Sequence, residues 1–172
     1  MNKILLATSI APFDLENQKR AVQSWLDAGF EVISCNIATE IECLKDHFPQ
    51  VEFVEMHRDG REVGGKPCPF ICDILQALKK KTTDICGIIN SDIHLRKINE
   101  EMLSAVREVA QESVVYLRRQ EIDDLTVLSD KVKEFHTYLF GIDAFFLHTK
   151  NIDKFDDSHQ RHQDLVHLHS TE

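Results

Sequence analysis

The chain has 172 residues, a length typical of one domain and sufficient to bury a core without disulfides or metals. Hydrophobic residues make up 42% of it and charged residues 28%, so the composition excludes wholesale disorder. The formal net charge of −9 disfavours a nucleic-acid platform, because such proteins hold phosphates with clustered lysine and arginine.

Strand-like and helix-like segments alternate along the chain. Short apolar or β-branched runs predict strands at 3–8, 31–35, 51–56, 85–90, 114–117 and 144–148. Between them, amphipathic segments predict helices at 14–28 with Asp14 as the N-cap, at 39–47, at 69–80, and up to 110 after the N-cap Asn99. This alternation predicts one α/β domain over residues 1–150, a three-layer α/β/α sandwich around a mostly parallel sheet.

Two polar stretches fall outside the alternation. Residues 57–66 contain three glycines and three cations, a composition that predicts a mobile loop. Residues 151–172 form a polar tail that carries four histidines: His159, His162, His167 and His169. A solvated tail is favoured over a metal site, because no cysteine or aspartate spacing nearby completes a zinc pattern.

The sequence shows no pattern typical of a secreted or membrane-spanning protein. Its first apolar run is too short for a signal peptide, and no apolar stretch approaches the ~20 residues of a spanning helix. The five cysteines are an odd number, and three of them sit in apolar runs, where cysteine packs as a small hydrophobe. We therefore expect a cytoplasmic protein with reduced thiols.

Polar residues directly follow the apolar runs of the predicted sheet. They are Thr8 and Ser9 after the first strand, Asn36 after the second, and Asn90, Ser91 and Asp92 after the central one. In open parallel sheets, ligands bind beyond the carboxyl ends of the strands, where the strand order reverses. A carboxylate there, beside an asparagine carbonyl, can hold Mg²⁺ or Mn²⁺. The alternative is that Asp92 only caps the turn after the strand.

The run IINSDIHL, residues 88–95, resembles the metal-binding segment of GT-A-fold glycosyltransferases, the nucleotide-diphospho-sugar transferase superfamily. In that family an apolar strand ends in Asp-x-Asp or in a variant with asparagine first. The resemblance covers about residues 3–150 and implies Asp92 as the ligand of Mn²⁺ or Mg²⁺, with Asn90 at the first position of the motif. It also implies that Thr8 and Ser9 lie in the loop that holds the base and ribose.

Two further segments resemble parts of the same family. KPCPFICDILQAL, residues 66–78, is similar to the helix before the metal strand, which implies that Lys66 and Asp73 face the donor. FGIDAFFLH, residues 140–148, resembles a later strand that brings Gly141 and Asp143 to the acceptor side. Asp143 is then the implied catalytic base, and the implied partners are a nucleotide-diphospho-sugar donor and an unknown acceptor.

The mobile loop adds cations to this picture, and other functions stay open. Arg58, Arg61 and Lys66 are expected to close over the donor phosphates and exclude water. A catalytically weakened or inactive sugar-nucleotide-binding module is the main alternative, supported by the neutral Asn90 and the short remainder after Asp143. A nucleotidyltransferase is disfavoured, because ATSIAPF after the first strand contains no glycine-rich phosphate loop.

Overall fold

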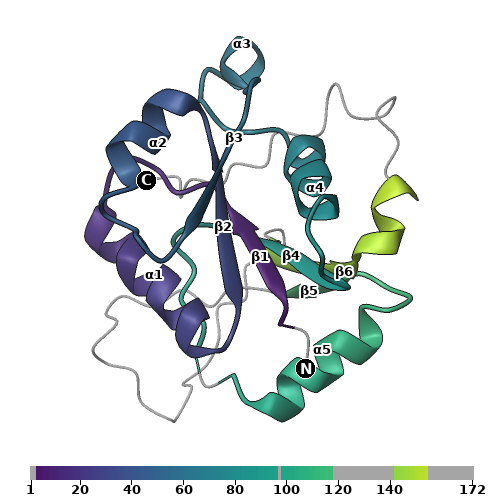
Figure 1. Ribbon diagram of the computed structural model, residues 1–172. Coiled ribbons are helices and arrows are strands. Elements are labelled where there is room, and N and C mark those ends of the chain that lie inside the picture. The colour runs from purple at the N-terminus through teal and green to yellow at the C-terminus, as the bar shows by residue number, and fades with distance from the viewer. Residues whose placement is uncertain (1–2, 97, 118–141, 155–172) are drawn as a thin grey trace.

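The computed structural model describes residues 3–96, 98–117 and 142–154, and its secondary structure follows the predicted alternation (Figure 1). The strands are β1 (Leu5–Thr8), β2 (Glu31–Asn36), β3 (Glu52–Glu55), β4 (Ile85–Ile89), β5 (Val115–Leu117) and β6 (Ala144–His148). The helices are α1 (Leu15–Asp27), α2 (Ala38–Leu44), α3 (Arg61–Gly64), α4 (Ile71–Lys79), α5 (Glu100–Val109) and the 3-10 helix η1 (Thr149–Lys154).

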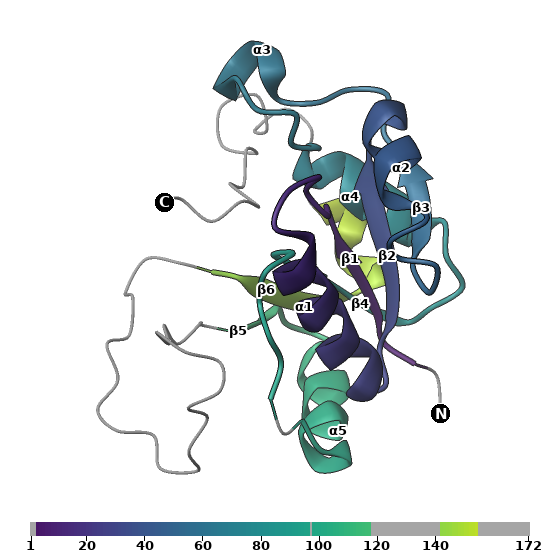
Figure 2. The ribbon, with the colours of Figure 1, turned by 90° about the vertical axis from the view of Figure 1, so that its left-hand side faces the viewer.

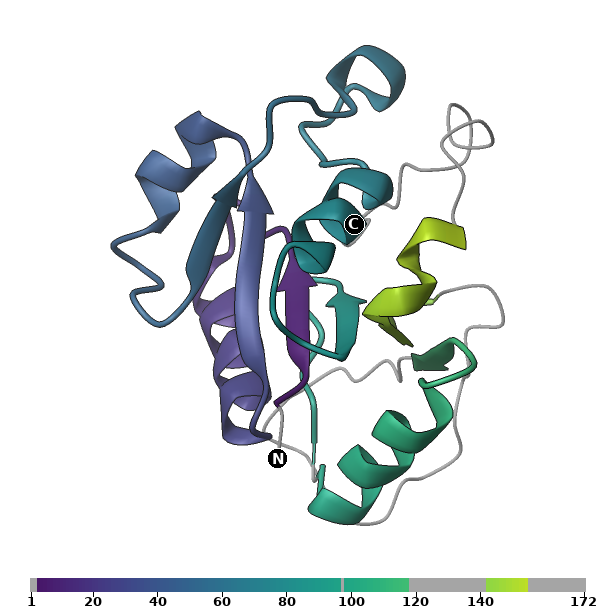
Figure 3. The ribbon, with the colours of Figure 1, turned by 45° about the vertical axis from the view of Figure 1, so that its right-hand side comes forward.

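The strands form one sheet in the order β3-β2-β1-β4-β6-β5 (Figure 3). β3, β2, β1 and β4 are parallel, whereas β6 runs antiparallel to both β4 and β5. Every residue of β4 is buried, as expected for a strand covered on both faces. The prediction of an α/β fold with a mostly parallel sheet is confirmed.

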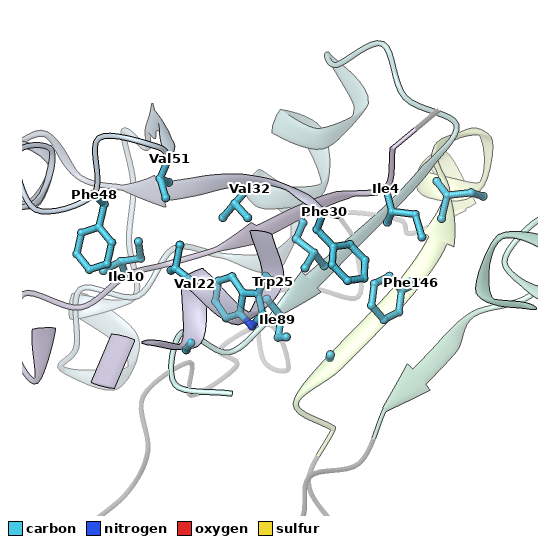
Figure 4. Close-up of a cluster of buried hydrophobic side chains, with 14 of the residues drawn as sticks. Ile4, Ile10, Val22, Trp25, Phe30, Val32, Phe48, Val51, Ile89 and Phe146 are labelled. Atoms are coloured by element: carbon cyan, nitrogen blue, oxygen red, sulfur yellow. The ribbon is translucent and has the colours of Figure 1, made fainter. Parts of the chain in front are cut away.

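Helices cover both faces of the sheet and bury one hydrophobic cluster on each (Figure 2). On one face, side chains of α1, α2 and α5 pack against alternate residues of the strands, and the Trp25 indole is the largest ring labelled there (Figure 4). On the other face, Ile74, Leu75 and Leu78 of α4 and Ile152 of η1 pack against the remaining strand residues. The three-layer arrangement therefore follows from the period-two burial of the strands.

The chain reverses its direction across the sheet between β1 and β4. From β1 it passes to β2 and then to β3 on one side, with α1 and α2 on the same face. After β3 it crosses the opposite face through α4 and returns to β4, on the other side of β1. The carboxyl ends of β1 and β4 therefore flank the switch point, the place where open α/β sheets bind ligands.

Two local predictions hold only in part. Asp14 occupies the N-cap position of α1, but its side chain makes no capping hydrogen bond and its backbone is left-handed, with φ 47°. The predicted mobile loop at 57–66 contains the short helix α3, which Gly65 ends in a left-handed conformation at φ 70°.

Some expectations concern residues that the structure does not describe. Gly141 and the four histidines of the polar tail lie outside the described residues, so no structural statement is made about them. Within the described ranges, none of the helices combines the length and the apolar character needed to cross a membrane.

Candidate functional site

The polar residues predicted at the carboxyl ends of β1, β2 and β4 are buried. Thr8 and Ser9 end β1, Asn36 ends β2, and Asn90 and Ser91 follow β4. The Thr8 hydroxyl is fully buried and has no hydrogen-bond partner among the described residues. Burying a polar group without a hydrogen-bond partner costs free energy, so the Thr8 hydroxyl marks this end of the strands as a candidate site.

A shallow hollow opens at the switch point, between the first turn of α1 and the segment after β4. Its lining residues are Ala11, Phe13, Asp14, Asn17, Gln18, Ser91 and Asp92. Asp92, the predicted metal ligand, is half-buried on this wall. The enclosed part of the hollow has a volume of about 20 Å³, which is room for about one water molecule or one ion, and it opens directly to solvent.

The segment after β4 is fastened to α1. The Trp25 indole Nε1 donates to the Ile93 carbonyl at 2.7 Å, and the Leu95 backbone N–H donates to Ser24 Oγ at 2.9 Å. His94 Nε2 lies 2.9 Å from Asn17 Oδ1. Burial, followed by the nearby Arg20 charge, lowers the pKa of His94, so its imidazole is neutral at pH 7. These contacts hold the segment that directly follows Asp92 against α1.

Asp143 and Asn90 are bonded to each other. Asn90 Nδ2 donates to Asp143 Oδ1 at 2.9 Å, and the Asn90 backbone N–H donates to the Asp143 carbonyl at 2.9 Å. Only 5% of Asp143 is exposed. The structure thus brings the predicted base next to the metal-binding segment, but it holds the carboxylate in a buried hydrogen bond.

Sequence reasoning named Asn36 but missed Gln18, Ser34 and Glu40, the other side chains that hold the loop after β1. Ser34, Asn36 and Gln18 bond the backbone groups of residues 10–13, and Glu40 in turn accepts a hydrogen bond from Asn36. The missed signal is a polar residue within an apolar helical stripe. Gln18 lies one turn before the buried Val22 in α1, and Glu40 lies one turn before the buried Leu44 in α2.

The basic residues at 57–66 do not line the hollow. Arg58 forms a two-pronged ion pair with Asp73, at 2.6 Å (Nε to Oδ2) and 2.9 Å (Nη2 to Oδ1), and its guanidinium lies 5.1 Å from the centre of the Phe70 ring. Arg61 is paired with Asp59 at 2.7 Å. Lys66 is exposed. Asp73, near the start of α4, is therefore occupied by its ion pair with Arg58, and neither residue lines the hollow next to Asp92.

The charged side chains that line the hollow are carboxylates, whose oxygen atoms can bind a metal ion. Asp14 and Asp92 both line it, and neither a lysine, an arginine nor a histidine is among its lining residues. In the described parts of the chain, no group of three histidine, cysteine, aspartate or glutamate side chains is arranged to hold a metal ion. The protein thus offers one or two carboxylates here, which matches Mg²⁺ or Mn²⁺ only when phosphate and water supply the other ligands.

Comparison of the sequence with models of known protein families gives no match, and comparison with curated proteins gives none either.

Proposed function

We propose that the chain binds a nucleotide-diphospho-sugar at the switch point, through a divalent cation held by Asp92, and transfers the sugar to an acceptor. The observation that carries this proposal is the position of Asp92, a half-buried carboxylate directly after the central strand and on the wall of the hollow. The resemblance of residues 88–95 to the GT-A metal segment supports the ligand class.

The charge of the hollow supports a cation between protein and ligand. Asp14 and Asp92 give the lining a negative charge, and no basic lining residue offsets it. A diphosphate would be repelled by these carboxylates unless a cation lay between them. Mg²⁺ commonly binds one or two carboxylates and completes its shell with substrate phosphates and water, so the donor set suits this arrangement.

The size of the hollow indicates which part of the ligand it takes. Its enclosed part of about 20 Å³ has room for the cation alone, so the phosphates and the rest of the donor would lie in the open space outside it. Phe13 lies on its rim with 54% of its surface exposed. An exposed ring offers a flat apolar face on which a base or a sugar can stack.

Sugar transfer breaks the bond between the anomeric carbon and the diphosphate, and negative charge grows on the departing phosphate oxygens. A bound divalent cation supplies Lewis acidity for that charge. Asp92 would hold the cation after the end of β4, and the exposed Lys66, which is not a lining residue, would add positive charge from outside the hollow. In this proposal Asp143 accepts the acceptor's proton, and the Asn90 amide orients its carboxylate.

A second candidate is a module that binds the nucleotide-sugar without turning it over. The Asn90–Asp143 hydrogen bond favours it, because the neutral residue of the metal motif and the proposed base are each other's partners. A base that is 95% covered must also be uncovered before it meets an acceptor hydroxyl. Hydrolysis or transfer of a bound donor decides between the two functions.

The proposal predicts Mn²⁺-dependent binding that requires Asp92. Calorimetry with UDP, GDP and their sugars should give binding with Mn²⁺ and little without it. Asp92→Asn keeps the side-chain shape but removes the charge, so we expect the affinity to fall by at least about tenfold, or ~1.4 kcal/mol. The melting temperature should change by no more than about 2 °C, because Asp92 is partly exposed.

The matched control is Asp46→Asn. It removes an exposed carboxylate between α2 and the start of β3, at the amino-terminal end of the parallel strands. This variant should bind as the wild type does. If the wild type binds none of these nucleotides with Mn²⁺, or if Asp92→Asn binds them equally well, the metal-dependent function is wrong.

A further inference from the structure

A closed ring of hydrogen bonds joins Ile10 to the end of β2. The Ile10 backbone N–H donates to Ser34 Oγ at 3.0 Å, and Ser34 Oγ donates to Asn36 Oδ1 at 2.6 Å. Asn36 Nδ2 completes the ring by donating to the Ile10 carbonyl at 2.9 Å. Both backbone groups of one loop residue are therefore bonded to side chains of β2, and none of these side chains is more than 1% exposed.

Glu40 fixes the orientation of the Asn36 amide. Asn36 Nδ2 donates to Glu40 Oε2 at 2.8 Å, in addition to the Ile10 carbonyl. An asparagine amide has two N–H groups, so both are used inside the protein. The Glu40 carboxylate accepts only, and it decides which end of the amide faces α2. Asn36 thus turns its donors towards the loop and α2, and none is left for a ligand.

Gln18 holds the next part of the same loop. The Ala11 N–H donates to Gln18 Oε1 at 2.8 Å, and Gln18 Nε2 donates back to the Ala11 carbonyl at 2.9 Å and also to the Phe13 carbonyl. The backbone from residue 10 to residue 13 is therefore held by buried side chains of β2 and α1. Ala11, Phe13 and Asp14 from this stretch line one side of the hollow.

We propose that Glu40, acting through Asn36, is a positioning residue that keeps residues 10–13 in the shape that forms the hollow. The 7%-exposed Glu40 carboxylate costs stability, since an apolar residue would fill that volume without desolvating a charge. Its benefit is local: it removes the freedom of the amide to flip and release Ile10. That this shape serves a nucleotide-sugar rests on the function proposed above; that Glu40 sets the shape does not.

Hydrogen exchange at single amides, measured by NMR at pH 7, tests this inference without a ligand. In Glu40→Ala the Ile10 amide should exchange about tenfold faster than in the wild type, a change equal to ~1.4 kcal/mol of local opening. The amides of β2 should keep their protection, and the melting temperature should not fall, because a buried charge has been removed. Glu40→Gln restores an acceptor for Asn36 and should restore the protection of Ile10.

Glu42→Ala is the matched control, because Glu42 is exposed on the same helix. The inference is overturned if Glu40→Ala leaves Ile10 protected, if Glu40→Gln fails to rescue it, or if protection is lost throughout the sheet. Calorimetry with Mn²⁺ and UDP or GDP then separates the two proposals. Tenfold weaker binding by Glu40→Ala supports both, whereas a wild type that binds neither nucleotide but shows the exchange pattern overturns the function alone.

Discussion

At the scale of single residues, Glu40 is unusual because it is an acidic residue that is only 7% exposed. It is an acidic side chain packed beneath the end of β2, where the Asn36 amide is its side-chain donor. Burial raises the pKa of Glu40 above its ordinary value of 4.5 and Asp59 raises it further, whereas the bonds from Asn36 and Ile37 and the charge of Arg61 lower it. Burial is the largest of these effects, so the pKa of Glu40 is higher in the folded protein than its ordinary value.

This shift predicts a pH-dependent cost that Glu40→Gln removes. A group whose pKa is raised by folding contributes most below its unfolded pKa, and that contribution is lost as the pH rises through the folded pKa. Glu40→Gln should therefore be more stable than the wild type at pH 7 and indistinguishable from it below pH 4.5. Urea unfolding at both pH values measures this, and equal stability at pH 7 would show that the buried carboxylate carries no cost.

At the scale of elements, β4 depends on a glycine. A Cβ atom at Gly87 would lie 2.6 Å from the Phe146 ring and 2.7 Å from the Phe145 carbonyl, both on the neighbouring β6. The carbonyl belongs to the sheet ladder and cannot move away without breaking the pairing. Gly87 therefore allows the closest approach between the parallel part of the sheet and its antiparallel strand.

Gly87→Ala is expected to destabilise the fold by about 1 to 3 kcal/mol, the usual result of overfilling a packed core. Urea unfolding measures the change, and Gly64→Ala on the exposed helix α3 is the control that should stay within about 0.5 kcal/mol of the wild type. A Gly87→Ala variant as stable as the wild type would mean that β6 shifts freely against β4.

The sequence predicts the elements better than their orientation. β6 begins and ends where the apolar run 144–148 does, but a period-two pattern is the same in both directions, so its antiparallel pairing was not predictable. The polar residues at the ends of β1, β2 and β4 were predicted, because they directly follow apolar runs. The α1 side of the hollow was not, because the helical pattern assigns polar residues such as Gln18 to solvent.

Contacts between residues far apart in the sequence could not be predicted from the pattern of apolar and polar residues either. Arg58 and Asp73 are 15 positions apart, and their ion pair depends on how α4 starts relative to β3. Asn90 and Asp143 are 53 positions apart, and they meet because β6 pairs with β4. Such contacts follow from the topology of the sheet, which local propensities do not contain.

At the scale of the whole molecule, the cysteines report on the core layer between the sheet and α4, which contains Cys35 and Cys86. All five are reduced thiols, and Cys43 is the exposed one. Burial raises the pKa of the Cys35 and Cys86 thiols to about 12, so neither forms the reactive thiolate in the folded protein at neutral pH. Cys68 and Cys72 are buried at the start of α4.

We therefore expect one fast-reacting thiol per chain with a disulfide reagent at pH 8, and five after unfolding in urea. Cys43→Ser should abolish the fast reaction without changing the slow one. Since Cys86 lies in the central strand, its labelling should proceed at the rate set by global opening. More than one fast thiol in the wild type would contradict the burial of the other four.

The loop at residues 10–13 owes its backbone conformation to Ser34, Asn36 and Gln18, which lie outside it. Within the loop, Ile10 is packed in the hydrophobic core, whereas Phe13 is 54% exposed beside the hollow. A smaller or more polar residue at position 13 should therefore leave the hydrogen bonds of Ser34, Asn36 and Gln18 to the loop backbone in place. The surface beside the hollow can thus differ in chemistry while the backbone that forms it stays the same.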